Sequence, residues 1–307
     1  MSSTLARVDG ATPGHFEGIR GRFDDYYELV KPRIIVLLLI TTAAAMLMAA
    51  RGIPPLALTF WTLLGGALAA ASAGALNCIY DVDIDALMNR TRNRPLPAGR
   101  ISISSATIYA IVLGVASFSI LFFLANPLAA WLSLAGNVYY VVIYTMWLKR
   151  ITPLNIVIGG AAGAVPPLVG WAAVTHAVGG PALGLFALIF LWTPPHFWSL
   201  ALMTELDYGK AKIPMLPNVS GRERTKVEIF VYSVVLVAAS LALYPLHVMG
   251  ALYFGAAAVL GGIFLIDALR TWFGRESQEY ARRLFRFSLV YLALMCVVMV
   301  IDRIWLG

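Results

Sequence analysis

The sequence predicts an all-α polytopic membrane protein with about nine transmembrane helices. Of its 307 residues, 60% are hydrophobic and only 13% are charged, whereas soluble domains use roughly 45–50% apolar and 25% charged residues. Nine segments approach the roughly 20 apolar residues that cross a hydrocarbon core. Each is expected to be a helix, because a helix satisfies its backbone polar groups internally. A barrel is excluded, because the apolar runs are continuous rather than alternating.

Charged residues and Pro/Gly-rich breaks separate the nine expected spans. By this criterion the spans cover residues 33–50, 55–79, 104–125, 127–147, 154–175, 180–202, 228–247, 249–269 and 285–303. Residues 1–32 are expected to form a cytoplasmic N-terminal tail, and residues 33–307 a single transmembrane domain. The tail contains acids and has no apolar core of its own, so the first span is expected to act as the insertion signal.

The distribution of cations predicts how the chain is oriented. Apart from Arg51 and Arg303, the 23 Lys and Arg residues fall on one side of the predicted spans. The positive-inside rule therefore places the N-terminus in the cytoplasm and the C-terminus outside. The expected location is the inner (plasma) membrane of a bacterial cell. The net charge of +7 is then a topology signal, and it gives no support to nucleic-acid binding.

The stretch NCIYDVDIDALMNRTRNRPLPAGR, residues 77–100, follows the second span and is dense in opposite charges. Asn77, Asp81 and Asp85 are spaced by four residues, which places them along one helix face. Asp83 lies about 200° from Asp81 on such a helix and is expected to point elsewhere. Carboxylates at membrane depth cost about 2.5–3.5 kcal/mol each, so they need a partner. Aligned oxygen ligands suit Mg²⁺, which completes its coordination with phosphate oxygens.

Basic residues follow this acidic stretch and a second one, MTELDYGKAKIPMLP, that ends the sixth span. Such side chains are suited to bind a diphosphate. The predicted diphosphate-binding cations are Arg90, Arg92, Arg94, Lys210 and Lys212. The alternative interpretation is a positive-inside anchor paired with a solvated helix end. The placement of Asn77, Asp81 and Asp85 on one helix face, and the partial repetition of this pattern at Asp207, favour the Mg²⁺–diphosphate site. Two similar four-helix halves plus a ninth helix would explain the repetition.

Over most of its length the sequence resembles the UbiA-type intramembrane prenyltransferases. The resemblance rests on the two acidic stretches and on ELVKPRIIVLLLITT, YTMWLKRITPLNIVIGGAAGAVPPLVGW and LWTPPHFWSLAL. It implies nine helices around a central cavity and two Asp-rich motifs that hold Mg²⁺ and an isoprenyl diphosphate. The implied catalytic residues are Asn77, Asp81, Asp85 and Asp207, with Asp81, Asp85 and Asp207 as metal ligands. The second motif departs from the usual Asp-x3-Asp, because the residue four positions after Asp207 is Ala211 rather than an aspartate; Glu205 is the alternative acid.

Within this superfamily the sequence is similar to the branch that farnesylates haem B. That similarity implies transfer of the farnesyl group of farnesyl diphosphate to a haem B vinyl group, with addition of water, giving haem O and diphosphate. The partners it implies are farnesyl diphosphate, haem B, the lipid bilayer, and a haem A synthase or terminal oxidase that takes the product. The alternatives are another aromatic acceptor, such as a quinone precursor or chlorophyllide, and an ion-coupled transporter. A transporter would carry charges near the bilayer midplane, whereas these acids lie at span ends.

His196 and Lys149 are the candidate haem-binding residues. His196 lies inside the sixth span, and its 11-residue distance from Asp207 corresponds to roughly 16 Å along a straight helix. It is therefore expected to serve the haem rather than the diphosphate, with a packing role as the alternative. Lys149 could contact a haem propionate or be a snorkelling anchor. The small residues of the fifth span suit either a flat ligand or close helix packing.

Overall fold

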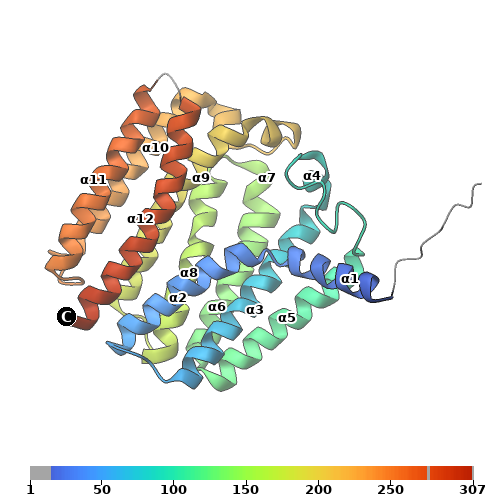
Figure 1. Cartoon of the computed structure of the whole chain (residues 1–307), viewed down its shortest axis with the longest axis horizontal. Helices are drawn as coiled ribbons and strands as arrows, with labels where there is room; N and C mark the ends of the chain where they lie inside the picture. The colour runs from blue at the N-terminus through green and yellow to red at the C-terminus, as the bar shows by residue number, and fades with distance from the viewer. Residues whose placement is uncertain (1–14, 275–276, 306–307) are drawn as a thin grey trace, which may run out of the picture.

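A computed structural model describes residues 15–274 and 277–305 of the chain, and within these residues all regular structure is helical (Figure 1). Nine of the described helical segments are long and apolar enough to cross a membrane. The elements are α1 (His15–Leu29), α2 (Pro32–Ala50), α3 (Leu56–Tyr80), α4 (Val82–Leu87), α5 (Ile103–Leu124), α6 (Pro127–Val138), the π-helix η1 (Tyr139–Leu148), α7 (Lys149–Ile151), α8 (Asn155–Thr175), α9 (Gly180–Lys210), α10 (Leu216–Ala242), α11 (Ala251–Phe273) and α12 (Ser277–Trp305).

The predicted spans match the observed helices closely except at several ends. The seventh span is predicted to end at residue 247, but α10 ends at Ala242, and the ninth is predicted to begin at residue 285, but α12 begins at Ser277. The sequence predicts that the sixth span ends at residue 202, but α9 continues to Lys210 across a kink at Thr204 (φ −118°, ψ 18°). It predicts that the seventh begins at residue 228, but α10 already begins at Leu216 and bends at Gly221 (φ 81°). Hydropathy marks only the apolar part of a helix. Both helices continue past their apolar part, and the additional turns are polar.

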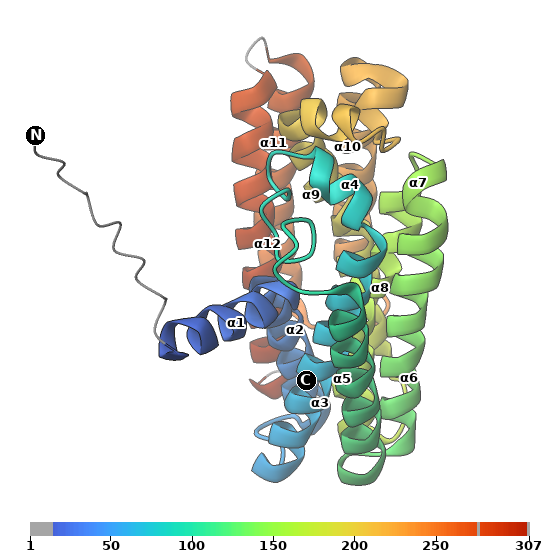
Figure 2. The same cartoon turned by 90° about the vertical axis from the view of Figure 1, so that its right-hand side faces the viewer.

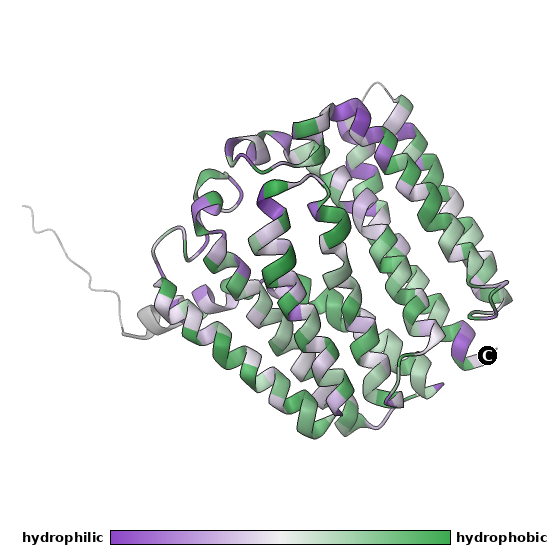
Figure 3. Ribbon diagram, turned by 180° about the vertical axis from the view of Figure 1, so that it is seen from behind, coloured by the Kyte–Doolittle hydropathy of each residue, from purple (hydrophilic) through white to green (hydrophobic). Residues whose placement is uncertain are grey.

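Polar residues gather at one end of the bundle, as Figure 3 shows. We call this the polar end: it is where α3, η1 and α9 end and where α10 and α12 begin. Apolar side chains cover the outer faces of the helices, as expected for a surface in contact with lipid. The predicted tail includes α1, which runs across the direction of the bundle helices (Figure 2). Arg100 ties α1 to the rest of the chain by pairing with Asp25 at 2.6 Å and Glu28 at 3.3 Å. Residues 1–14 of the tail lie outside the described part.

The largest buried cluster is formed by α2, α8, α9, α10, α11 and α12. Its largest fully buried side chains include Trp198, Tyr253, Phe264 and Tyr291. Of the nine spans, α9 is the most enclosed by other helices. The helix that leads to the second acidic motif, α9, is therefore held inside a packed group of helices.

Two local features, one in the fourth span and one in α8, affect how the helices pack. The fourth span changes from α-helix to π-helix at Tyr139, and Thr145 donates a hydrogen bond to the Tyr140 carbonyl five residues earlier (2.9 Å). Such wide turns often accompany functional sites. On α8, a Cβ added at Gly170 would lie 2.3 Å from the Thr42 carbonyl oxygen of α2. Glycine is therefore required there for α2 and α8 to approach each other.

Candidate active site

The first acidic motif spans the junction of α3 and α4. Asp81 joins the two helices (φ −91°, ψ 7°), and the Asp85 amide donates to the Asp81 carbonyl at 2.8 Å, so the helical turn continues. Asn77 Nδ2 donates to Asp81 Oδ2 at 2.8 Å. The side chains of Asn77, Asp81 and Asp85 are buried, with residue exposures of 3%, 1% and 2%. The spacing correctly predicts that these three residues share one inward face.

Asp83 points away from this face, as predicted. Its side chain is exposed and accepts hydrogen bonds from Arg150 at 2.7 and 2.8 Å. The hydrogen bond from Arg150 lowers the pKa of the Asp83 carboxyl group, against the opposing effect of burial. Asp83 is therefore an exposed ion-pair residue, separate from the buried face.

Cations pair with the buried motif from three parts of the chain. Lys149 donates to Asp81 Oδ2, and Arg94 donates to Asp85 Oδ2 at 2.6 Å. Lys31 Nζ donates to Asn77 Oδ1 at 2.5 Å. Burial is the largest single effect on the pKa of the Arg94 guanidinium and lowers it, but nearby negative charge, chiefly that of Asp85, together with the hydrogen bond to Asp85, raises the pKa overall. Each buried acid therefore has a cationic partner, as buried charges require.

The π-helix places several of these partners. Thr145 Oγ1 accepts a hydrogen bond from Asn77 Nδ2 at 3.1 Å, while Lys149 follows one turn later. Tyr144 stacks on Tyr140 with ring centroids 5.3 Å apart, and it interacts electrostatically with Asp81. Neither Thr145 nor Tyr144 is among the residues that the sequence predicts for the site. The only signal for them is their position four and five residues before Lys149.

The second acidic motif lies beside the first. A hydrophobic cluster joins Ile84 and Met88 of the first motif to Ala211, Ile213 and Met215 of the second. Tyr208 packs against this cluster and interacts electrostatically with residues of both motifs, which are Asp85, Arg90, Arg94 and Asp207. The structure therefore brings the two stretches together at the polar end, around the ends of α3 and α9.

The predicted ligands of the second motif are less enclosed than those of the first. Asp207 is half-buried and lies 3.9 Å from Lys210, which is exposed. Glu205, the alternative acid, forms an ion pair with Arg222 of α10 at 2.7 Å. Among the predicted diphosphate-binding cations, Arg94 is half-buried, and the exposed ones are Arg90, Arg92, Lys210 and Lys212.

A metal centre of three acidic ligands is not assembled in this arrangement. Within the described residues, no three His, Cys, Asp or Glu side chains are close enough together to hold one ion. Lys149 and Arg94 already neutralise Asp81 and Asp85, so these carboxylates are not forced to share a cation. Even so, Asp81 Oδ1 is buried and accepts no hydrogen bond from a described residue, and the guanidinium of Arg150 is 3.9 Å away from it. An oxygen of this kind fits a hard divalent ion.

His196 lies deeper in the bundle, between α9 and α12. Its ring stacks on Trp192 at 4.1 Å and on Phe285 at 4.6 Å, and Nδ1 forms a hydrogen bond of 2.6 Å with Ser288 Oγ. Both ring faces and one nitrogen are therefore occupied, which leaves Nε2 for any ligand. On a straight helix, as the sequence predicts, His196 would lie roughly 16 Å from Asp207. Because α9 is kinked at Thr204, between these two residues, that separation does not hold. Lys149, the other candidate haem residue, lies at Asp81 instead of near His196.

Comparison with known proteins assigns this arrangement to a family. Residues 38–290 match the model of the UbiA prenyltransferase family. The chain belongs to the UbiA prenyltransferase family. Two cyanobacterial relatives, both named protoheme IX farnesyltransferase, come from Synechocystis sp. and Gloeobacter violaceus. The first is 55% identical over 91% of this chain and 89% of the relative, and the second is 53% identical over 100% and 99%.

Solved structures show that the UbiA fold itself is shared. A structure of digeranylgeranylglyceryl phosphate synthase superposes with a TM-score of 0.77 at 18% identity, covering 93% of this chain and 100% of that one. A UbiA homolog from Archaeoglobus fulgidus, bound to DMAPP and Mg²⁺, gives 0.63 at 18% identity and covers 90% and 99%. The predicted all-α fold and the predicted family are confirmed, and this UbiA prenyltransferase is a multi-pass membrane protein.

Proposed function

We propose that this enzyme transfers the farnesyl group of farnesyl diphosphate to a vinyl group of haem B. The observation that carries the proposal is 53% identity along the whole chain to a relative named protoheme IX farnesyltransferase. In the reaction, the terminal vinyl carbon bonds to farnesyl C1 as the bond from C1 to the diphosphate oxygen breaks. Water adds to the neighbouring vinyl carbon and releases a proton. The products are haem O, which carries a hydroxyethylfarnesyl chain, and diphosphate.

The buried face of the first motif is the proposed site of Mg²⁺, with Asp81 and Asp85 as ligands and Asp207 joining from the second motif. Its support is the donor set: Asn77, Asp81 and Asp85 offer oxygens only, and Asp81 Oδ1 has no hydrogen-bond donor among the described residues. When bound, Mg²⁺ supplies positive charge that stabilises the leaving diphosphate. Asn77 orients Asp81 through its hydrogen bond, while Lys31 and Thr145 hold Asn77 in place.

Cations around this face are the proposed diphosphate ligands. They are Arg90, Arg92 and Arg94 from the first motif and Lys210 and Lys212 from the second. Arginine binds phosphate oxygens in bidentate fashion, and Arg94 is already held inside the site by Asp85. Its guanidinium is therefore the best oriented of the set. The others are exposed, where they can meet a diphosphate arriving from water.

The haem is the second proposed substrate, with His196 as a ligand or guide and Lys149 as a contact for a propionate. His196 is suited to this role because it is buried among aromatic rings and its Nε2 is the ring position left for a ligand. Lys149 is suited to it only when the ammonium leaves Asp81. The arrangement separates an apolar region for the porphyrin from the charged polar end.

The proposed setting is the inner membrane of a bacterium, with the N-terminus in the cytoplasm and the C-terminus outside. It rests on the cations, which concentrate at the polar end. Farnesyl diphosphate then enters from the cytoplasmic side. The product is handed to a haem A synthase or to a terminal oxidase.

Mass spectrometry of the haem tests the proposal directly. Purified enzyme in detergent is given haem B, farnesyl diphosphate and Mg²⁺, with parallel samples that lack Mg²⁺ or contain Asp81→Asn. The expected product is a haem heavier by a farnesyl group and a hydroxyl, formed only in the complete sample. An unchanged haem mass in the complete sample would contradict the proposal. Prenylation of a quinone precursor in the same assay would assign the alternative acceptor.

A further inference from the structure

A groove lies between the ends of α11 and α12 at the polar end, and no residue of the candidate active site lines it. Its volume is ≈ 690 Å³, and its lining residues are Ile263, Asp267, Gln278, Glu279, Arg282, Arg283, Arg286, Phe287 and Val290. This volume falls in the range of about 300–1,000 Å³ that is usual for small-ligand sites. The groove opens on the outside of the bundle, where Ile263 and Val290 are 38% and 49% exposed.

The lining changes from charged to apolar along α12. Arg282, Arg283 and Arg286 come first, and Phe287 and Val290 follow toward the middle of the helix. From Arg282 to Val290 the helix rises about 12 Å, which is enough to pass from the headgroup region into the hydrocarbon. Because α11 is antiparallel to α12, its apolar Ile263 lies near this deeper end. A ligand matching the groove therefore has an anionic head and an apolar chain.

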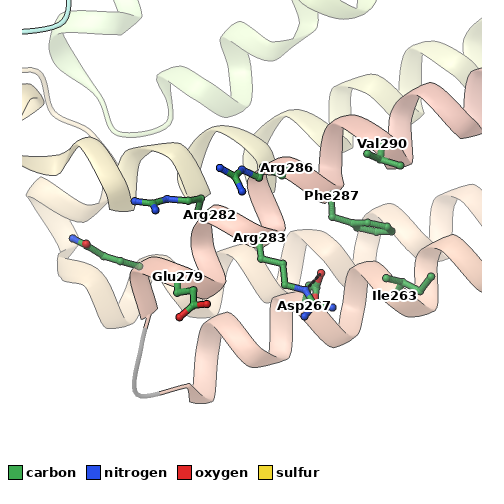
Figure 4. Close-up of a pocket in the computed structure, with 9 residues that line it drawn as sticks. Ile263, Asp267, Glu279, Arg282, Arg283, Arg286, Phe287 and Val290 are labelled. Atoms are coloured by element: carbon green, nitrogen blue, oxygen red, sulfur yellow. Dashed lines mark hydrogen bonds and ion pairs between the residues drawn. The ribbon is translucent and has the colours of Figure 1, made fainter.

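Two of the arginines are available to such a head. Asp267 is buried and forms an ion pair with Arg283 at 3.0 Å. Its carboxylate also lies 3.5 Å from the guanidinium of Arg270. Figure 4 shows Arg283 reaching toward Asp267, whereas Arg282 and Arg286 extend to the same side, one turn apart. Neither of these two forms an ion pair with a residue that the structure describes. Side chains at this spacing are neighbours on a helix, so both guanidiniums can reach one phosphate.

We propose that this groove binds one anionic phospholipid, with its phosphate on Arg282 and Arg286 and an acyl chain along Ile263, Phe287 and Val290. The charge is complementary, because the four guanidiniums at the groove, counting Arg270, exceed the carboxylates of Asp267 and Glu279. The occupant is a membrane lipid, since the apolar end opens outward to the bilayer. Glu279 faces the same groove and opposes the anionic head. The lipid thereby links the ends of α11 and α12.

Native mass spectrometry of the purified protein tests this, with phosphatidylglycerol compared against phosphatidylcholine of the same acyl chains. Wild type is expected to retain one phosphatidylglycerol about tenfold more tightly than phosphatidylcholine. Arg282→Gln/Arg286→Gln should lose this preference, and Glu279→Gln should strengthen it. The matched control, Arg22→Gln/Arg224→Gln, removes two exposed arginines elsewhere and should keep the wild-type preference.

Several outcomes would overturn the proposal. Equal retention of the two lipids by wild type would do so without relying on any variant, as would an unchanged preference in Arg282→Gln/Arg286→Gln. Displacement of phosphatidylglycerol by glycerol 3-phosphate would mean that the groove takes a free phosphate. Displacement by farnesyl diphosphate would assign the groove to the substrate. Because the readout is lipid binding, it is independent of whether haem B is the prenyl acceptor.

Discussion

Lys149, at the junction of η1 and α7, donates a hydrogen bond to the buried carboxylate of Asp81, 68 residues earlier in the chain. The same oxygen of Asp81, Oδ2, also accepts from Asn77, whereas Oδ1 accepts no hydrogen bond from a described residue. A divalent ion at Asp81 and the ammonium of Lys149 repel each other, since both carry positive charge. If Mg²⁺ binds at this face, as we propose, its binding is expected to be coupled to release of Lys149, which would free the ammonium to contact an anionic substrate group.

Replacing either buried carboxylate should abolish most activity. Asp81→Asn and Asp85→Asn are each expected to lower turnover by at least about a hundredfold, because losing one charge-stabilising contact commonly costs on the order of 3 kcal/mol. Asp83→Asn is the matched control, since Asp83 is exposed and outside the buried face. Turnover is measured on protein that elutes from size exclusion as wild type does. Normal turnover in both variants would mean that Asp81 and Asp85 serve only to form ion pairs and have no part in catalysis.

Removing the Lys149 ammonium should separate metal binding from catalysis. In Lys149→Met, the Asp81 carboxylate loses its competing cation, so the substrate-free protein is expected to bind Mn²⁺ more tightly than wild type. Electron paramagnetic resonance of free Mn²⁺ measures this affinity. Turnover should fall in the same variant, because the proposed contact between the lysine and a substrate is lost. Weaker Mn²⁺ binding would instead show that Lys149 helps to hold the site in its metal-binding form.

Among the three arginines of the first motif, Arg94 should be the most sensitive to replacement by lysine. Arg94→Lys keeps the charge but loses the planar, bidentate geometry. Arg94 is also the member held against Asp85. We expect kcat/KM for farnesyl diphosphate to fall by about tenfold, equivalent to roughly 1.4 kcal/mol. Arg22→Lys, at an exposed position on α1, is the control. If a variant with Arg90, Arg92 and Arg94 all changed to lysine works normally, the arginines are only topological anchors.

The membrane part of this fold could be predicted from the sequence because lipid imposes one strict requirement. Every span must be apolar and internally hydrogen-bonded, so apolar runs separated by charged and Pro/Gly-rich breaks were enough to predict the nine membrane-crossing helices of the described residues. The same signal could not predict the helical turns of α9 beyond residue 202 or of α10 before residue 228, because these turns are polar. Helical periodicity likewise placed Asn77, Asp81 and Asp85 on one face, since that relation is local.

The partners of the acidic residues could not be predicted in this way. Lys149 and Arg150 are adjacent, yet Lys149 pairs with Asp81 and Arg150 with Asp83. Which cation meets which acid depends on the rotation of η1 against α3, and the π-helical turns set that rotation. The contact of Lys31 with Asn77, across 46 residues, depends in the same way on the tertiary arrangement of α2 and α3.

The small residues of α8 have different roles, which a stability measurement can separate. Gly170→Ala is expected to destabilise the protein by about 1–3 kcal/mol, the usual cost of overpacking, because the new methyl group meets the Thr42 backbone carbonyl at 2.3 Å. Gly163→Ala is the matched control, since no neighbouring atom lies within 4 Å of the position that its methyl group would take. Thermal unfolding in detergent should show a lower midpoint for Gly170→Ala alone. Equal midpoints would mean that α2 and α8 can separate without loss.

His196 provides the sharpest test of where the haem binds. Its ring faces contact Trp192 and Phe285, and its Nδ1 contacts Ser288, so a direct ligand interaction requires Nε2. His196→Ala should therefore weaken haem binding, seen as a changed Soret absorption on titration, while farnesyl diphosphate binding stays close to wild type. Ser288→Ala removes the partner of Nδ1 but keeps the imidazole, so it should weaken haem binding less than His196→Ala does.

A purely structural role for His196 predicts a different pattern. The histidine would then matter only for packing between α9 and α12, and His196→Ala would lower the unfolding midpoint and weaken both substrates together. Replacement by phenylalanine distinguishes the two roles, because Phe can stack between Trp192 and Phe285 but has no ring nitrogen. His196→Phe is expected to unfold near the wild-type temperature and still bind haem poorly. If it binds haem as wild type does, His196 is a packing residue, and the haem must be held by other side chains.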